Sequence, residues 1–178
     1  MAAALTSEAA LVRVPGAVLS HETAARFWGI ELVDDDGRQR LMVPRNNGRY
    51  AVVGWHVQRS DLAEDDIVTV GGLRLTSLPR TLRDLGVTLS LERAVAAFDS
   101  ALRQRLVDRR AVEQLAARAR GPGAGRLRQV ARLVDPQSGS VLESLLRVLF
   151  VLAGLAGFQT QYVVRSGRTF VARVDFCW

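Results

Sequence analysis

The sequence predicts an α/β fold, built from a small mixed α/β segment, a helical middle segment and a short unit of one helix and two strands at the C-terminal end. Short apolar runs bounded by Gly, Asn and Asp dominate up to residue 76. Amphipathic helical periodicity follows from about 78 to 133, and one apolar helix then precedes two alternating strands. Apolar residues make up 48% and charged residues 24% of the 178 residues, as in an ordinary globular protein.

The first segment is predicted to contain one helix and four strands. Ser20 stands at the N-cap of a helix that Gly29 ends. Strands are predicted at 41–43 and 50–57, joined by the turn-forming run Arg-Asn-Asn-Gly. Two more short apolar runs flank Gly71-Gly72, which predicts a two-residue hairpin.

Four helices are predicted in the middle segment. The first runs from about 77 to 85, and the second from Ser90 to about Arg105. Two shorter helices, at 110–118 and 125–133, are separated by a Gly-Pro-Gly run that no helix interior accepts. One face of the second helix carries Leu91, Val95, Phe98 and Leu102.

A composition change after Val134 predicts a domain boundary. The run Asp-Pro-Gln-Ser-Gly that begins there is typical of a linker. An apolar helix at 141–155 follows, and then strands at 160–165 and 169–178. We therefore expect one domain over residues 1–134 and a second, partial domain over 135–178.

Several functional classes are excluded by composition. Cys177 is the single cysteine, so no disulfide framework forms, and with only His21 and His56 beside it no zinc cage can be assembled. The two histidines are interpreted as structural. The longest uncharged apolar run, 148–158, has 11 residues, too few to span a bilayer. With no targeting signal at the start, we expect a soluble cytoplasmic protein without a membrane partner.

Positive charge is concentrated in one part of the chain. The net charge is +6, and all 24 basic residues are arginines. Nine of them lie between Arg103 and Arg132 against only Asp108 and Glu113, a local charge of +7, so the rest of the chain sums to −1. Two interpretations stay open: a surface that contacts nucleic-acid phosphates, or the solvated face of amphipathic helices. The candidate nucleic-acid-binding residues are Arg109, Arg110, Arg118, Arg120, Arg126, Arg128 and Arg132.

Two carboxylates are candidate catalytic and metal-ligating residues. Glu143 lies one turn into a predicted helix, and Asp175 lies in a predicted strand. Such a pair can hold Mg²⁺ against a phosphodiester, because Mg²⁺ prefers hard oxygen ligands. Two other interpretations stay open. Glu143 can complete a capping box with Ser140 and accept the Ser140 amide, and Asp175 can form a surface ion pair with Arg173.

Four landmarks in the sequence carry a family resemblance. They are Leu-Ser-His-Glu-Thr-Ala-Ala-Arg-Phe-Trp-Gly at 19–29, Gln-Arg-Ser-Asp-Leu at 58–62, Leu-Arg-Leu-Thr-Ser-Leu-Pro-Arg-Thr-Leu-Arg-Asp-Leu at 73–85, and Val-Leu-Glu-Ser-Leu at 141–145 followed by Phe-Val-Ala-Arg-Val-Asp-Phe at 170–176. In this order they resemble actinobacterial proteins related to the AbiEi-type antitoxins of type IV toxin–antitoxin systems. Many such proteins carry a C-terminal domain similar to very-short-patch-repair endonucleases, which have the restriction-endonuclease-like PD-(D/E)XK fold.

The resemblance implies a metal site that this sequence holds only in part. In the nuclease fold a helix supplies a Glu and a strand an Asp, which Glu143 and Asp175 match. A next strand supplies a second acidic residue, whereas only Phe176, Cys177 and Trp178 follow Asp175. Relatives also begin with a winged helix-turn-helix, for which the 18 residues before the first landmark leave no room. We therefore expect the chain to correspond to the middle part of a longer protein.

Two functions follow as expectations. The first is a nucleic-acid-associated regulator resembling AbiEi-type antitoxins, non-catalytic in this form and without a cofactor. Its partners would be duplex DNA, bound weakly and without sequence preference, and a cognate toxin. The alternative is a Mg²⁺-dependent DNA endonuclease of the very-short-patch-repair-like class, whose metal site is completed by missing residues or by a partner. A gene fragment without activity is a third interpretation.

Overall fold

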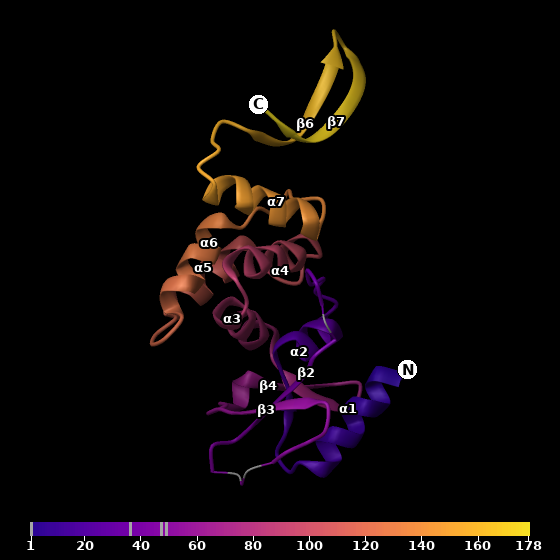
Figure 1. Cartoon of the computed structure of the whole chain (residues 1–178), viewed down its shortest axis with the longest axis vertical. Coiled ribbons are helices and arrows are strands. Elements are labelled where there is room, and N and C mark those ends of the chain that lie inside the picture. The colour runs from indigo at the N-terminus through magenta and orange to yellow at the C-terminus, as the bar shows by residue number, and fades with distance from the viewer. Residues whose placement is uncertain (1, 36, 47, 49) are drawn as a thin grey trace. The chain divides into compact units, whose positions relative to one another are not determined.

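The computed structural model describes residues 2–35, 37–46, 48 and 50–178, which form a mixed α/β fold as predicted (Figure 1). These residues divide into two compact units. The first unit is Met1–Ile30 with Asp34–Leu85, and the second is Glu31–Val33 with Gly86–Trp178. The domain boundary expected after Val134 stays a prediction. Asn47, in the turn predicted between the strands at 41–43 and 50–57, lies outside the described residues.

The first unit is built on a five-stranded mixed sheet with the strand order β3-β2-β1-β5-β4. Its central strand β1 is antiparallel to β2 and parallel to β5. Gly71 and Gly72 form the predicted hairpin turn between β4 and β5, with φ angles of 57° and 83° that favour glycine. The elements are α1 (Ala2–Arg13), β1 (Val18–Leu19), α2 (His21–Trp28), β2 (Gln39–Val43), β3 (Trp55–Arg59), the 3-10 turn η1 (Glu64–Asp66), β4 (Ile67–Val70), β5 (Leu73–Thr76) and α3 (Leu78–Thr88), which continues into the second unit.

The strand predicted over 50–57 begins later than expected. β3 spans Trp55–Arg59, because Gly54 has a φ of 80° and a tight turn brings the Trp55 amide to 3.0 Å from the Val52 carbonyl oxygen. β3 then pairs with β2 in parallel, from Gln39 opposite Trp55 to Val43 opposite Arg59. The chain between them is therefore a crossover and not a simple hairpin turn.

Helix α1 was not predicted from the sequence. Ser7 and Ala10 are the buried residues of α1 among those whose side chains are described, and both are small, so its amphipathic pattern is weak. Ala10 and Val14 pack against Leu41 and Val43 of β2 in one core cluster. The helix therefore depends on the sheet that it covers more than on its own periodicity.

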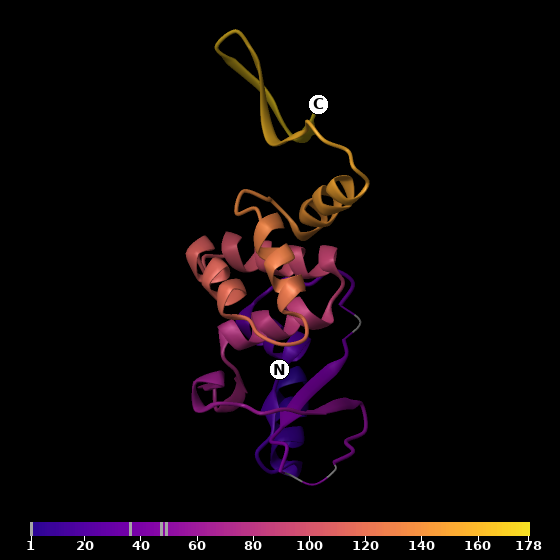
Figure 2. The same ribbon diagram turned by 90° about the vertical axis from the view of Figure 1, so that its left-hand side faces the viewer.

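The second unit is a helical assembly that ends in a long hairpin (Figures 1 and 2). Helix α4 is buried over the continuous run 94–102, so it is enclosed on all sides and not only along its predicted apolar face. Leu127 is 2% exposed and Phe98 1% exposed, and both pack closely against Gly86. The unit comprises α4 (Leu91–Arg103), α5 (Arg109–Arg118), α6 (Ala124–Leu133), α7 (Val141–Leu152), β6 (Gln159–Ser166) and β7 (Thr169–Cys177).

Helix α7 leads into the hairpin of β6 and β7. It ends three residues before the predicted position, because Gly154 adopts a φ of 75° and the Leu155 amide bonds the Phe150 carbonyl oxygen at 3.0 Å. The ring of Phe150 packs edge-on against Phe176 and Trp178, which connects α7 to β7. None of the helices in the described part of the chain has the length and apolar content that a membrane crossing needs.

Candidate functional site

Six of the seven candidate arginines lie on α5 and α6, which pack side by side, and Arg120 lies in the loop between them (Figures 1 and 2). Asp108 caps α5 by accepting the Ala111 amide at 2.7 Å, and Gly123, with a φ of 84°, begins α6. Val112 and Ala116 bury one face of α5. The apolar face of each helix therefore turns inward, and its arginine-bearing face is left to solvent.

All seven candidate arginines are exposed, and together they form what we call the arginine surface. Arg109 pairs with Glu113 at 3.1 Å, whereas Arg120 and Arg126 donate to backbone carbonyl oxygens. Among the described residues, the other four have neither a hydrogen-bond partner nor an ion-pair partner: Arg110, Arg118, Arg128 and Arg132. Their guanidinium groups face solvent, a geometry that fits both contact with phosphates and the solvated face of amphipathic helices.

Glu143 adopts a modified form of the predicted capping box. Ser140 Oγ accepts the Glu143 amide at 3.1 Å, as expected. The Glu143 carboxylate, however, accepts the amide of Gly139 at 2.8 Å and not that of Ser140. A Cβ at Gly139 would lie 2.9 Å from Glu143 Oε2, so the absence of a side chain there permits the close approach.

The structure brings Glu143 and Asp175 together through a residue that the sequence analysis missed. Gln161 Nε2 donates to Glu143 Oε2 at 2.8 Å and to Asp175 Oδ1 at 3.1 Å. No ion pair between Arg173 and Asp175 is present among the described residues, so the surface-pair interpretation of Asp175 is not supported. We call Glu143, Gln161 and Asp175 the carboxylate cluster.

The carboxylate cluster has one chemical feature of a cation site and lacks another. Glu143 is only 6% exposed, and its Oε1 has no hydrogen-bond partner in the described part of the chain. A buried carboxylate oxygen without a partner is costly, and a hard cation such as Mg²⁺ would satisfy it. No group of three or more His, Cys, Asp or Glu side chains among the described residues is placed to hold a metal ion. A metal ion held there would need ligands beyond Glu143 and Asp175.

The most specific part of the resemblance, residues 76–85, forms a buried hydrogen-bonded hub. Arg80 is 5% exposed, and its Nε lies 3.0 and 3.1 Å from the two carboxylate oxygens of Asp84. Its Nη atoms reach Asp66 Oδ2 at 2.7 Å and Ser60 Oγ at 2.9 Å. Burial raises the pKa of Asp84 to about 6, and the charge of Arg80 opposes this rise. These residues tie the start of α3 to the loop after β3, which is a structural role.

The two histidines do not form a nucleophilic or acid–base site. His21 is buried, and its Nδ1 lies 3.0 Å from Ser20 Oγ. Burial lowers the pKa of His21 to about 3, with Arg40 and Arg80 adding to the effect, so the ring is neutral at physiological pH. His56 lies on β3 with its side chain exposed. The structural interpretation of both histidines therefore agrees with their surroundings.

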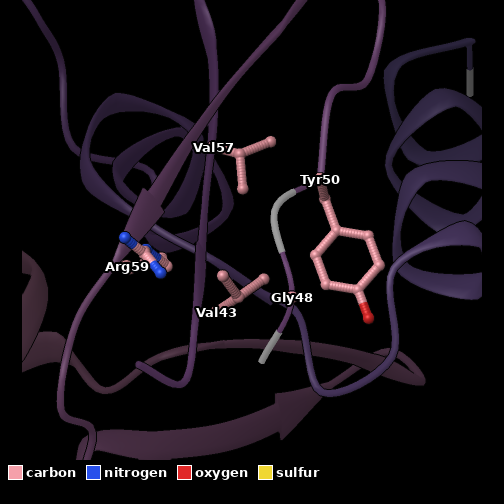
Figure 3. A pocket seen from close by; sticks show the side chains of 5 residues that line it. All are labelled: Val43, Gly48, Tyr50, Val57 and Arg59. Carbon is pink, nitrogen blue, oxygen red and sulfur yellow. The ribbon is translucent and has the colours of Figure 1, made fainter. Parts of the chain in front are cut away.

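One open pocket in the first unit contains none of the sequence-predicted residues (Figure 3). Its volume is about 280 Å³, and in Figure 3 Val43 and Val57 lie between the Tyr50 ring and the Arg59 guanidinium. Gly48 completes the lining. The pocket offers one cation and one phenol above an apolar floor, which is too general a chemistry to identify a ligand.

Comparison of the chain with protein-family models, with curated proteins and with solved structures finds no match. The arginine surface and the carboxylate cluster therefore have to be interpreted from their own geometry.

Proposed function

We propose that this protein is a nucleic-acid-associated regulator of the AbiEi-antitoxin type, non-catalytic by itself, which binds duplex DNA through the arginine surface. The observation that carries the proposal is the set of four exposed arginines without partners on α5 and α6. Guanidinium groups on a solvent-facing surface suit the oxygens of a phosphate backbone. The sequence resemblance supports a cognate toxin as a further partner.

The binding is expected to be weak and independent of DNA sequence. The segment from Arg103 to Arg132 contains no aromatic residue to stack on bases. Its long cationic side chains contact phosphates, which carry no direct sequence information. Such binding is dominated by the release of counterions, so it must fall steeply with salt.

A salt titration tests this proposal. With four phosphate contacts, the logarithm of the association constant falls against the logarithm of salt concentration with a slope of about −3.6. Changing Arg118, Arg128 and Arg132 to Gln flattens the slope by about 2.7, measured by fluorescence anisotropy of a labelled duplex.

The matched control removes the same charge from the first unit. Arg13, Arg59 and Arg74 are exposed and have no hydrogen-bond or ion-pair partner among the described residues. Changing these three to Gln leaves the slope within about one unit of wild type, because they lie outside the arginine surface. Equal effects of the two triple variants would assign the binding to net charge alone and contradict the proposed surface.

A second candidate function, a Mg²⁺-dependent endonuclease with a completed site, is favoured by the carboxylate cluster. Glu143 and Asp175 share the Gln161 amide, and Glu143 Oε1 is buried without a partner. These two carboxylates would hold Mg²⁺, which when bound polarises a phosphodiester and activates water. The remaining ligands would come from a partner, from further residues or from substrate phosphate. Calorimetric titration with Mg²⁺, with Glu143→Gln/Asp175→Asn as the control, tests whether the pair binds the ion.

A further inference from the structure

Gln161 connects the two candidate ligands through a single amide group. Its Nε2 lies 2.8 Å from Glu143 Oε2 and 3.1 Å from Asp175 Oδ1. Ionised carboxylates only accept hydrogen bonds, so the amide nitrogen must face them and the amide oxygen must face away. Both N–H groups are therefore used to hold two groups of like charge next to each other.

The backbone of Gln161 is held in an unusual conformation at this point of β6. Its φ is +52°, in the left-handed region that a residue with a side chain rarely adopts. The regular pairs Thr160–Phe176 and Tyr162–Val174 lie on either side of it in the hairpin. Strained conformations of this kind persist where the surrounding structure holds them, and they cluster at functional sites.

The carboxylate that Gln161 holds on α7 has an unused oxygen. Glu143 is only 6% exposed, yet its Oε1 has no hydrogen-bond partner in the described part of the chain. Gly139 and Gln161 both bind the other oxygen, Oε2. The cluster thus orients Glu143 firmly and leaves one buried anionic oxygen free for a cation.

We infer that Gln161 is the positioning residue of the carboxylate cluster, and that its amide turns to present Oε1 as a third oxygen ligand when a divalent cation binds. Half a turn about the Cγ–Cδ bond exchanges Nε2 and Oε1 without moving the backbone. Glu143, Gln161 and Asp175 then each offer an oxygen of the hard type that Mg²⁺ prefers. This inference rests on the second candidate function. Without a bound cation, the hydrogen bonds to Glu143 and Asp175 keep the Gln161 amide in its present orientation.

Side-chain amide signals report the turn directly. In ¹⁵N-labelled wild-type protein, titration with Mg²⁺ alone should shift both side-chain N–H signals of Gln161, since they lose their carboxylate acceptors. The signals are assigned by their absence from the spectrum of Gln161→Glu. Gln159 is exposed on the same strand and has no partner among the described residues, so its side-chain signals should stay in place.

Cation affinity provides a second readout. Gln161→Ala should weaken Mg²⁺ binding about 10-fold to 100-fold, as loss of an outer partner of a metal ligand does. Gln161→Glu should strengthen it about 10-fold above neutral pH, because a third carboxylate adds a charged oxygen. Gln159→Ala is the matched control and should leave the affinity within about twofold.

The outcomes separate this inference from the function on which it rests. Mg²⁺ binding that depends on Glu143 and Asp175 but leaves the Gln161 side-chain signals in place overturns the inference alone. Absence of Mg²⁺ binding at millimolar concentration overturns both the inference and the second candidate function. The wild-type titration does not use Gln161→Ala, so the inference stays testable even where that variant fails to fold.

Discussion

Arg147 on α7 and Asp99 on α4 form a buried ion pair, in which Arg147 Nη2 donates to Asp99 Oδ2 at 2.8 Å. Asp99 is fully buried, and its Oδ1 also accepts the amide of Asp135 at 2.7 Å. Arg147 lies one helical turn after Glu143, so the same helix carries a buried ion pair and a candidate ligand. This pair therefore anchors α7, and with it Glu143, to the helical core of the second unit.

Breaking the Asp99–Arg147 pair should destabilise the protein strongly. Arg147→Met leaves the buried Asp99 carboxylate without its charge partner, which costs about 3–5 kcal/mol of unfolding free energy in urea. Adding Asp99→Asn to that variant removes the unpaired charge and should recover part of the loss. Arg110→Met, on the exposed face of α5, is the control and should change stability by less than about 0.5 kcal/mol. A small cost for Arg147→Met would mean that the pair contributes little.

Acid should weaken the fold through His21. The folded pKa of His21 is lowered to about 3 by burial, and its unfolded value is 6.5, so the unfolded state binds the extra proton between these values. The stability that neutral His21 contributes is complete above pH 6.5 and falls by about 1.4 kcal/mol per pH unit as the pH drops toward 3. Urea unfolding at several pH values, compared with His21→Gln, checks this slope.

The comparison with His21→Gln is necessary because another buried group acts in the opposite direction. The raised pKa of Asp84, about 6, gives stability that is lost as the pH rises through that value. Subtracting the pH profile of His21→Gln cancels the contribution of Asp84. Identical slopes in wild type and variant would contradict a neutral buried His21.

We expect no metal-dependent cleavage of DNA by this chain alone. Without a third acidic ligand, two carboxylates joined by an amide are poor at holding a metal ion and at orienting water. No third acidic side chain is placed to complete a metal site among the described residues. Supercoiled plasmid incubated with the protein and Mg²⁺ or Mn²⁺ should show no nicking above a Glu143→Gln/Asp175→Asn control. Nicking that disappears in that double variant would overturn the proposal of a non-catalytic regulator.

The C-terminal hairpin should promote self-association. β6 and β7 form a two-stranded sheet, and Phe170, Val171 and Trp178 are 59%, 57% and 66% exposed. Exposed apolar side chains beside open strand edges favour association between copies. Sedimentation velocity over a concentration series should show reversible association, and Val171→Lys should shift the protein toward monomer.

Val53→Lys is the matched control for this prediction. Val53 is fully exposed in the first unit, and the same substitution there should leave the association unchanged. Hydrogen exchange adds a second measurement, in which residues 160–178 exchange faster than α7. A monodisperse wild-type monomer at high concentration with strongly protected hairpin amides would show that the hairpin is stable by itself.

The elements with local signals could be predicted from the sequence. Asp108 caps α5, and the Gly71-Gly72 pair forms the turn between β4 and β5, because capping and tight turns depend on neighbouring residues only. The exposure of the arginine surface follows from the same logic, since the apolar residues of α5 and α6 recur on the opposite face of each helix. Helical periodicity was therefore sufficient to place these side chains.

Long-range pairing decided the rest of the first unit. No residues near β2 and β3 in the sequence indicate that the two strands pair in parallel. The buried side chains described in α1, Ser7 and Ala10, are too small to give the helix a clear apolar face. The hub around Arg80 likewise brings Ser60 and Asp66 to the helix that carries Arg80 and Asp84. Such contacts depend on which segments the core brings together, which local propensity does not specify.

The carboxylate cluster shows both contributions at one place. The sequence by itself determined that Glu143 lies in the first turn of a capped helix and that Asp175 lies in a strand. Only the tertiary structure decided that Gln161 joins them, because the hairpin changes register between Val164 and Arg165. Without that one-residue shift the turn would set a different residue opposite Asp175, and every side chain before the shift would change faces. Register is set by this irregularity in the pairing of β6 with β7, and no local pattern in the sequence encodes it.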